Sequence, residues 1–368
     1  MNPNPNSGAE TFLMKLTSNS RRLCIGLASV LGVVFLWVAS GFLTNEILSD
    51  FDKPFFVTYA GTVSFQLYFL FLFIYDRFLK PLKSKTKTDQ LSMKESSEES
   101  KEEEKLPPLT ALQTLKIGFF FFLIYFAANY TMNLAFGWTS VGSASILAST
   151  SGLFTMIFAF IFRQEQITTM KVLSILISVG GAIIISHQEF SGEGNNTKGN
   201  MMALTSAVCY GLYSVTLKKI AVNESRVNMP LLFGIIGFFC TLFLWPIFLI
   251  FHYTSFEEFL FPTGKILGYL ILNILFGSLL ANFLWLVAMS YSTPLIVAIG
   301  LSMNIPLTLL GEVVLQHKEI PLYKIMSALC VVVGFLIVNI AELIPSIDSK
   351  LDSIFCLFRK ANKPLEKA

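Results

Sequence analysis

The chain has 368 residues and a formal net charge of +3, with 54% of its residues hydrophobic and 14% charged. The hydrophobic share exceeds the roughly 45–50% of a typical soluble protein, which argues against an ordinary soluble domain. Three His and five scattered Cys argue against a histidine-rich metal centre and a disulfide framework, and we expect no metal and no other cofactor.

Long apolar segments follow one another along the chain. A helix that crosses a membrane needs about 20 mostly apolar residues. Ten segments reach or approach that length, so we predict an all-α membrane protein with ten transmembrane helices. The predicted helices are, in chain order, Leu23–Leu43, Phe55–Tyr75, Leu115–Phe136, Val141–Phe162, Thr168–Ser186, Asn200–Leu217, Leu231–Phe251, Ile266–Met289, Pro294–Leu315 and Tyr323–Ile340.

Polar segments separate or flank these helices. Residues 1–22 form a tail, 76–113 a long loop, 187–199 a short loop and 342–368 a second tail. The long loop starts basic and turns acidic, which predicts disorder. Within it, Ser96 and Ser100 each have Glu three residues on and are candidate phosphorylation sites, with an unregulated linker as the alternative.

The second half of the sequence repeats the first. A shift of 153 positions places Asn129 on Asn282 and Ser149 on Ser302 without a gap. Each half, 23–186 and 200–341, holds five predicted helices, and an odd number inserts the second half upside down. We therefore predict two inverted five-helix repeats, the usual build of a secondary transporter with its solute site between the repeats.

Basic residues predict the orientation of the helices. With both termini in the cytoplasm, all but five of the 27 Lys and Arg lie on the cytoplasmic side. Positive charge is retained inside during insertion, so this asymmetry supports cytoplasmic termini. The positive net charge then reflects topology, and we expect no nucleic-acid partner. The short loop is predicted to be lumenal, which makes Asn195, in Asn195-Asn196-Thr197, a candidate glycosylation site.

The matched amides are the first candidate site. A buried amide in hydrocarbon is costly unless it is bonded. Because Asn129 and Asn282 occupy the same place in each repeat, we expect them to face each other across a pseudo-two-fold axis. Tyr130 and Trp285 flank them, which favours solute binding; the alternative is that the amides bond helices together.

Aromatic and hydroxyl side chains extend this candidate site. Trp37 and the pair Tyr210 and Tyr213 lie in segments that align across the repeat, and such rings suit an uncharged or cationic organic solute. Ordinary aromatic packing is the alternative. Ser149 lies in a hydroxyl-rich helix, and Asn304 lies beside Pro306, which frees a carbonyl four residues back. These residues are solute-contact candidates, with close helix packing and a structural kink as the alternatives.

Glu312 is the acidic residue well inside a predicted helix, near its lumenal end. Intramembrane carboxylates are expensive and by default suggest function. Glu312 could couple transport to protons, or it could pair with Lys318 or His317 at the surface. No nucleophilic serine, paired intramembrane aspartates or phosphate loop is evident, so we expect neither an enzyme nor an ATP-driven pump.

Several motifs resemble a known family. They include Trp37-Val38-Ala39-Ser40, Ser149-Thr150-Ser151, Tyr210-Gly211-Leu212-Tyr213-Ser214 and Gly300-Leu301-Ser302. Over nearly the whole chain the sequence resembles the drug/metabolite transporter superfamily, and within it the fungal vacuolar-membrane proteins related to solute carrier family 35 subfamily F, including thiamine-repressible relatives. The resemblance implies a multi-pass transporter in the vacuolar membrane, with the Golgi as the alternative. The relatives usually carry Asp where Glu312 stands, and the resemblance assigns no binding residues.

Two classes of function remain open at this point. The first is a secondary transporter that moves a small organic solute across the lipid bilayer; the second is a membrane scaffold or sensor. Matched polar residues favour transport. A nucleotide-sugar antiporter would need cations near the cavity, yet Lys116, Lys218 and Lys219 lie near helix ends. A neutral or cationic metabolite therefore fits better, and thiamine is suggested by the resemblance. A homodimer is left open.

Overall fold

The computed structural model describes residues 6–74, 77, 111–163, 168–190, 195–220, 228–291 and 300–343. Every regular element in these ranges is a helix. Most of the predicted 76–113 loop, with Ser96 and Ser100, and almost all of the C-terminal tail lie outside the described residues. The same holds for the side chain of Asn195, although the backbone of this residue begins a helix.

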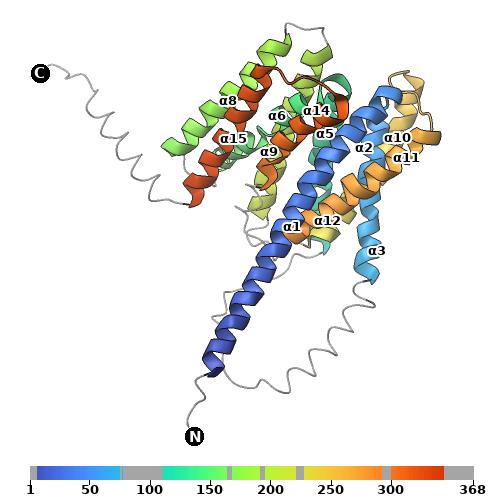
Figure 1. The fold of residues 1–368 in the computed structure, drawn as a ribbon. Helices are drawn as coiled ribbons and strands as arrows, with labels where there is room; N and C mark the ends of the chain where they lie inside the picture. The colour runs from blue at the N-terminus through green and yellow to red at the C-terminus, as the bar shows by residue number, and fades with distance from the viewer. Residues whose placement is uncertain are drawn as a thin grey trace, which may run out of the picture.

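The helices follow the predicted order (Figure 1). Those of the first half are α1 (Asn6–Asp50), α2 (Pro54–Val63), the 3-10 turn η1 (Ser64–Gln66), α3 (Leu67–Ile74), α5 (Ala111–Trp138), α6 (Val141–Ala148), α7 (Ser151–Ile161) and α8 (Thr169–Phe190). Those of the second half are α9 (Asn195–Ile220), α10 (Met229–Tyr253), α11 (Gly264–Leu272), the π-helix η4 (Asn273–Leu280), α12 (Ala281–Tyr291), α14 (Asn304–Gln316) and α15 (Leu322–Leu343).

Two kinds of difference separate these bounds from the predicted ones. Helix α1 begins at Asn6 rather than Leu23, because the polar residues before Leu23 contain no proline after Pro5 and continue the helix beyond its apolar part. Four predicted helices are interrupted: Phe55–Tyr75 by η1, Val141–Phe162 after Ala148, Ile266–Met289 by η4, and Pro294–Leu315 at Met303, directly before α14. Hydropathy shows where a chain is apolar, but it does not reveal interruptions within an apolar segment.

Six of the predicted spans are long and apolar enough to cross a membrane: Cys24–Asp50, Pro54–Ile74, Leu112–Trp138, Val141–Ile161, Met229–Tyr253 and Gly264–Met289. Two shorter apolar helices, Met170–Ile185 and Leu322–Gly334, accompany them. Large apolar side chains point outward along the bundle, such as Phe35 and Phe73, which are 66% and 65% exposed. An apolar exterior of this extent suits hydrocarbon rather than water.

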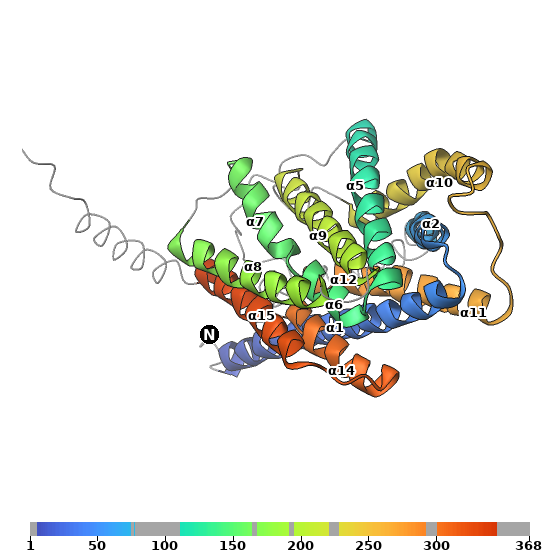
Figure 2. The same ribbon diagram turned by 90° about the horizontal axis from the view of Figure 1, so that it is seen from above.

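The helices pack in pairs that join the two halves. Helix α8 lies along α15, α5 and α7 lie along α9, and α1 lies along α12 (Figures 1 and 2). Each pair takes one helix from residues before position 191 and one from residues after position 194. The halves are therefore interleaved, and their interface runs through the middle of the molecule.

The α8–α15 pair carries a reciprocal pair of hydrogen bonds. The Ser174 hydroxyl donates to the Gly334 carbonyl at 2.8 Å, and the Ser327 hydroxyl donates to the Gly181 carbonyl at 2.7 Å. These residues correspond under the 153-position shift, Ser174 with Ser327 and Gly181 with Gly334. Each helix thus donates one serine hydrogen bond to the other and accepts one at the corresponding glycine carbonyl, as a local two-fold relation between α8 and α15 requires.

Glycine allows this close crossing. A Cβ atom on Gly181 would lie 2.9 Å from the Ser327 carbonyl oxygen, and one on Gly334 would lie 2.9 Å from the Ser174 carbonyl oxygen. Both neighbours are backbone atoms, which cannot rotate away. A Cβ atom on Gly180, the preceding residue of α8, would have no neighbouring atom within 4 Å.

We expect Gly181→Ala to lower the free energy of unfolding by about 1–3 kcal/mol, because the added methyl overpacks the crossing. The control Gly180→Ala should be neutral or stabilising by up to about 1 kcal/mol, since alanine favours helix. Thermal unfolding of the purified protein measures both. Equal shifts for the two variants would contradict this account of the crossing.

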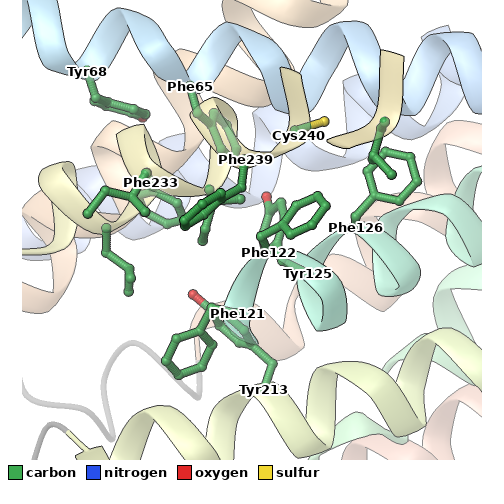
Figure 3. Packing of buried hydrophobic residues seen from close by; sticks show 14 of the residues in the cluster. Phe65, Tyr68, Phe121, Phe122, Tyr125, Phe126, Tyr213, Phe233, Phe239 and Cys240 are labelled. Carbon is green, nitrogen blue, oxygen red and sulfur yellow. The ribbon is translucent and has the colours of Figure 1, made fainter. Parts of the chain in front are cut away.

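An aromatic cluster fills the space between α2–α3, α5 and α10 (Figure 3). Phe65, Phe121 and Phe122 are essentially fully buried there. Most of their ring contacts are edge-on or tilted, as in Phe65 with Phe233 at 5.2 Å between centroids, a geometry that aromatic quadrupoles favour. Tyr213 brings α9 into the same cluster, so the cluster holds several helices in fixed relation.

The loop between α10 and α11 anchors the start of α2. Both carboxylate oxygens of Glu257 accept backbone hydrogen bonds, from Phe55 at 3.1 Å and from Phe56 at 3.0 Å. The N-cap residue of α2, Lys53, makes no side-chain capping bond, so Glu257 supplies the acceptor from another part of the chain. Burial raises the pKa of the Glu257 carboxyl above its ordinary value, although the two backbone bonds oppose the shift.

The raised pKa of Glu257 predicts a pH dependence. The folded protein holds this proton more tightly than the unfolded chain, so stability should fall as pH rises through the range above the ordinary glutamate pKa. We expect Glu257→Gln to remove this component, while Glu258→Gln, at an exposed neighbouring position, should keep it. Unfolding temperature against pH measures both. A Glu257→Gln protein with the wild-type slope would contradict the assignment.

Candidate functional site

Two helices are broken at matching positions. Between α6 and α7, the Thr150 amide donates to the Leu147 carbonyl, three residues back rather than four, at 3.0 Å. Before α14, the Met303 amide donates to the Gly300 carbonyl, also at 3.0 Å. Thr150 and Met303 correspond under the 153-position shift. Irregular backbone at membrane depth is tolerated where protein covers it or where it lines a water-filled cavity.

The hydroxyl groups beside the breaks bond within their own helices. Ser149 donates to the Ser145 carbonyl at 2.8 Å. Thr155 and its counterpart Thr308 donate to the carbonyls four residues back, at 2.8 and 2.7 Å. These donors are satisfied by the protein, and their hydroxyl oxygens retain the capacity to accept a hydrogen bond.

Asn304 differs from these residues. Its side-chain oxygen Oδ1 is buried and has no hydrogen-bond partner within the described residues. Asn304 begins α14 directly after the second break, and Pro306 in the same turn has no amide to donate to the Ser302 carbonyl. A buried acceptor without a donor is unusual in a folded protein and indicates a place where water or a solute donates.

The matched amides Asn129 and Asn282 each bond the carbonyl four residues back. Asn129 donates to Tyr125 at 2.8 Å and Asn282 donates to Ser278 at 2.6 Å. Asn129 also accepts a hydrogen bond of 2.9 Å from the Tyr210 hydroxyl, which ties α5 to α9. Among the described residues no hydrogen bond joins the two amides directly, so their facing each other stays a prediction.

The predicted aromatic residues lie on three helices. Tyr210 and Tyr213 are on α9, and Tyr213 packs edge-on against Phe121 at 5.1 Å between ring centroids. Trp285, on α12, packs against the aromatic cluster and is partly buried. Trp37 is half-buried on α1, which lies along α12. The structure therefore brings Tyr213 and Trp285 to one cluster and leaves Trp37 on a neighbouring helix.

A second polar group joins α1 to the π-helix. Asn273 opens η4, donates to the Thr44 hydroxyl at 2.9 Å and accepts from the Ser40 hydroxyl at 2.5 Å. π-Helical turns occur frequently at functional sites. Helix α12, which carries Asn282 and Trp285, follows η4 directly.

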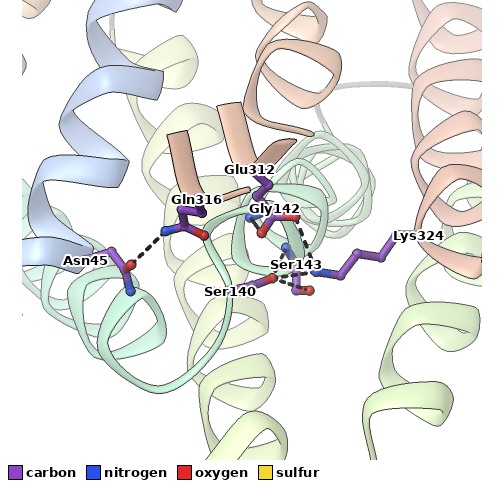
Figure 4. A network of polar contacts seen from close by, with 7 residues as sticks. All are labelled: Asn45, Ser140, Gly142, Ser143, Glu312, Gln316 and Lys324. Atoms are coloured by element: carbon purple, nitrogen blue, oxygen red, sulfur yellow. Dashed lines mark hydrogen bonds and ion pairs between the residues drawn. The ribbon is translucent and has the colours of Figure 1, made fainter. Parts of the chain in front are cut away.

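Glu312 is almost completely buried, with 1% of its surface exposed. Its carboxylate accepts a hydrogen bond of 2.9 Å from the Gly142 amide and lies 3.4 Å from the Lys324 ammonium (Figure 4). The Lys324 ammonium also donates to the Ser140 hydroxyl at 2.7 Å. The carboxylate thus pairs with Lys324, rather than with either of the cations considered from sequence, His317 and Lys318, whose side chains are exposed.

Lys324 is the residue that sequence reasoning missed. The predicted orientation places it among the five basic residues on the lumenal side, since it follows the predicted helix Pro294–Leu315. The helical spacing was the available signal: Ser327, Ala328 and Val331 follow Lys324 by three, four and seven residues, and all four are buried. Lys324 therefore lies on the inward face of α15.

A cavity of about 500 Å³ lies beside the first break, between α7, α8 and α9. Its lining is apolar apart from Thr150 and His187, and includes Leu153, Val179 and Ile183. None of the solute-contact residues predicted from sequence is among its described lining. Val179 and Ile183, which line the cavity from α8, are exposed, so the cavity is open to the outside of the bundle.

The chain matches the EamA-like transporter family over residues 24–187 and 197–340. It belongs to this family. Two fungal relatives cover most of its length. The uncharacterized transporter C405.03c of Schizosaccharomyces pombe is 35% identical over 86% of this chain and 95% of its own. The uncharacterized vacuolar membrane protein YML018C of Saccharomyces cerevisiae is 33% identical over 88% of this chain and 92% of its own.

More distant comparisons agree. Solute carrier family 35 member F5 of Pongo abelii is 29% identical over 87% of this chain and 77% of its own length. A crystal structure superposes with a TM-score of 0.55 at 15% identity, covering 90% of this chain and 99% of the other, which supports the fold alone. The resemblance to the drug/metabolite transporters and to subfamily F is confirmed, and the chain is a multi-pass membrane protein of a transporter family.

The contact between Glu312 and α6 depends on Gly142. A Cβ atom at Gly142 would lie 2.7 to 2.9 Å from the Glu312 carboxyl group. We expect Gly142→Ala to displace the carboxylate and lower the free energy of unfolding by about 1–3 kcal/mol. Gly268→Ala, which has nothing within 4 Å, is the control and should not destabilise the protein. Thermal unfolding compares the two, and an unaffected Gly142→Ala protein would show that the contact is dispensable.

Proposed function

We propose that the protein is a secondary transporter that moves a small organic solute by alternating access, with ten helices arranged as two inverted five-helix repeats. The observation that carries the proposal is the pair of helix breaks at Thr150 and Met303, which share one hydrogen-bond pattern. Discontinuous helices at corresponding places in two halves are a feature of transporter solute sites.

Further features support the repeat. The family model matches two segments whose bounds lie within a few residues of the predicted halves. The reciprocal bonds between α8 and α15 follow the same 153-position correspondence. We place both termini in the cytoplasm from the distribution of Lys and Arg, and the protein in the vacuolar membrane by analogy with its yeast relative.

We place the solute site between the halves, beside the two breaks. Asn304 offers its unpaired oxygen, and Asn129, Asn282 and Ser149 add amide and hydroxyl groups. Trp37, Tyr210, Tyr213 and Trp285 supply aromatic surface nearby. In the described residues the one buried cation, Lys324, is paired with Glu312. That pairing favours a neutral or cationic solute over a nucleotide sugar, whose phosphates would need cations.

Proton coupling through Glu312 is part of the proposal. The carboxylate is buried, paired and in contact with both halves through Gly142 and Lys324. Protonation would remove one charge of the pair, and a buried lysine without its partner is strongly unfavourable. A proton on Glu312 would therefore shift the balance between conformations that keep this contact and conformations that release it.

The test is thermal unfolding of the purified protein against vitamins, amino acids, polyamines and nucleotide sugars. A ligand at 100 times its dissociation constant stabilises by about 2.7 kcal/mol. We expect a neutral or cationic metabolite to raise the unfolding temperature, and Asn304→Ala, Asn129→Ala and Asn282→Ala to abolish the shift.

Thr205→Ala is the matched control, because Thr205 is exposed and its hydroxyl bonds only its own helix. It should keep the ligand-induced shift. Two negative results together would favour the alternative of a scaffold or sensor. No compound in the panel would stabilise the protein, and vacuoles from cells that lack its gene would have an unchanged solute content. A shift only with nucleotide sugars would move the assignment to an antiporter of those compounds.

A further inference from the structure

Three helices from both halves meet at one buried charge cluster. Ser140 and Gly142 lie at the start of α6, Glu312 lies near the end of α14, and Lys324 lies in the first turn of α15. We call these four residues the latch. Within the latch, the Glu312 carboxylate accepts a hydrogen bond from the Gly142 amide of α6 (Figure 4). The Lys324 ammonium donates to the hydroxyl of Ser140, the N-cap residue of α6.

The latch also organises the start of α6. The Ser140 oxygen that receives the Lys324 ammonium also accepts from the Ser143 amide at 3.2 Å and so caps the helix. The Glu312 carboxylate takes the Gly142 amide, another amide that has no partner inside the helix. Negative charge at a helix N-terminus is favourable. The cap and the ion pair therefore form or break together.

Neighbouring contacts close the same end of the bundle. Asn45 on α1 donates to the Phe136 carbonyl of α5 at 2.6 Å and accepts from Gln316 of α14 at 3.1 Å. Gln316 lies one helical turn after Glu312, so α1, α5, α6, α14 and α15 are all linked there. Moving α6 away from α14 and α15 would break the two latch bonds and leave a buried ion pair facing water.

The sequence repeat does not reproduce the carboxylate of the latch at the corresponding position of the first half. Under the 153-position shift Lys324 corresponds to Lys171, but Glu312 corresponds to Ala159. Ala159 is buried and has no group that could pair with a cation or accept an amide hydrogen bond. The repeat therefore differs between the halves at the position of the latch carboxylate.

We propose that Ser140, Gly142, Glu312 and Lys324 form a one-sided latch that holds this end of the bundle, which the predicted orientation makes the lumenal end, closed. Lys324 is a positioning residue that keeps Glu312 against α6. The inference rests on the proposed function, since a closed end has meaning in a protein that alternates between two openings. It goes beyond that function in assigning the closed state to one side.

Hydrogen–deuterium exchange of the purified full chain tests the latch directly. In Glu312→Gln and Lys324→Ala, we expect exchange across residues 139–148, which include the Gly142 amide, to be at least tenfold faster than in the wild type. Residues 151–161 of α7 should exchange at the wild-type rate. Lys324→Arg, which keeps the charge, should stay within threefold of the wild type.

Two controls separate the latch from a general charge effect. Lys318→Ala removes an exposed lysine at the same end, and Lys171→Ala removes the counterpart of Lys324 at the other end. Both should leave exchange in residues 139–148 unchanged. Unchanged exchange in Glu312→Gln and Lys324→Ala, or an equal increase throughout the chain, would overturn the proposal. If either variant fails to fold, the other carries the test, because each removes one charge of the latch.

The exchange experiment needs no solute, so it separates this proposal from the transport function. A local increase confined to α6 supports the latch even while the solute is unidentified. Once the unfolding panel has given a stabilising compound, uptake of that compound by vacuolar vesicles is measured for the same variants. Local opening together with altered uptake joins latch and transport, whereas altered uptake without local opening would remove the latch and leave the transporter assignment standing.

Discussion

Hydrocarbon offers no hydrogen bonds, and this single constraint governs the structure. An unsatisfied backbone group at membrane depth costs several kcal/mol, so an uninterrupted helix is the default for a spanning segment. Three departures from it among the described residues are compensated. The breaks at Thr150 and Met303 reroute their amides to carbonyls three residues back, and the start of α6 takes Ser140 and Glu312 as acceptors.

The same constraint explains which contacts hold the halves together. Between lipid-immersed helices there is little hydrophobic driving force, so close packing and hydrogen bonds carry association. Gly181 and Gly334 let α8 and α15 approach until serine hydroxyls reach the opposite backbone. The aromatic cluster, which includes Phe65 and Phe122, holds α2, α5 and α10 together through contacts between rings.

Much of the fold could be predicted from the sequence because its causes are local or periodic. Apolar length placed the helices, and the 153-position repeat paired Ser174 with Ser327 before any contact was known. The breaks were only partly foreseen: Pro306 marked one, whereas the Thr150 break has no proline. Lys324 and Glu257 could not be placed, because their partners are Glu312, Phe55 and Phe56, and spatial neighbours at such separations depend on tertiary packing.

The unequal ends of the bundle bear on kinetics rather than on energy. A carrier with two equivalent faces would wait for solute equally on either side. One that rests closed on one side presents its site mainly to the other, so half-saturating concentrations differ between the two directions of flow. The gradient at which net movement stops is unaffected, because an empty carrier's resting preference cancels over a complete cycle. A latch that acts at one end, as proposed for Glu312 and Lys324, would thus make a reversible carrier fast in one direction without making it a pump.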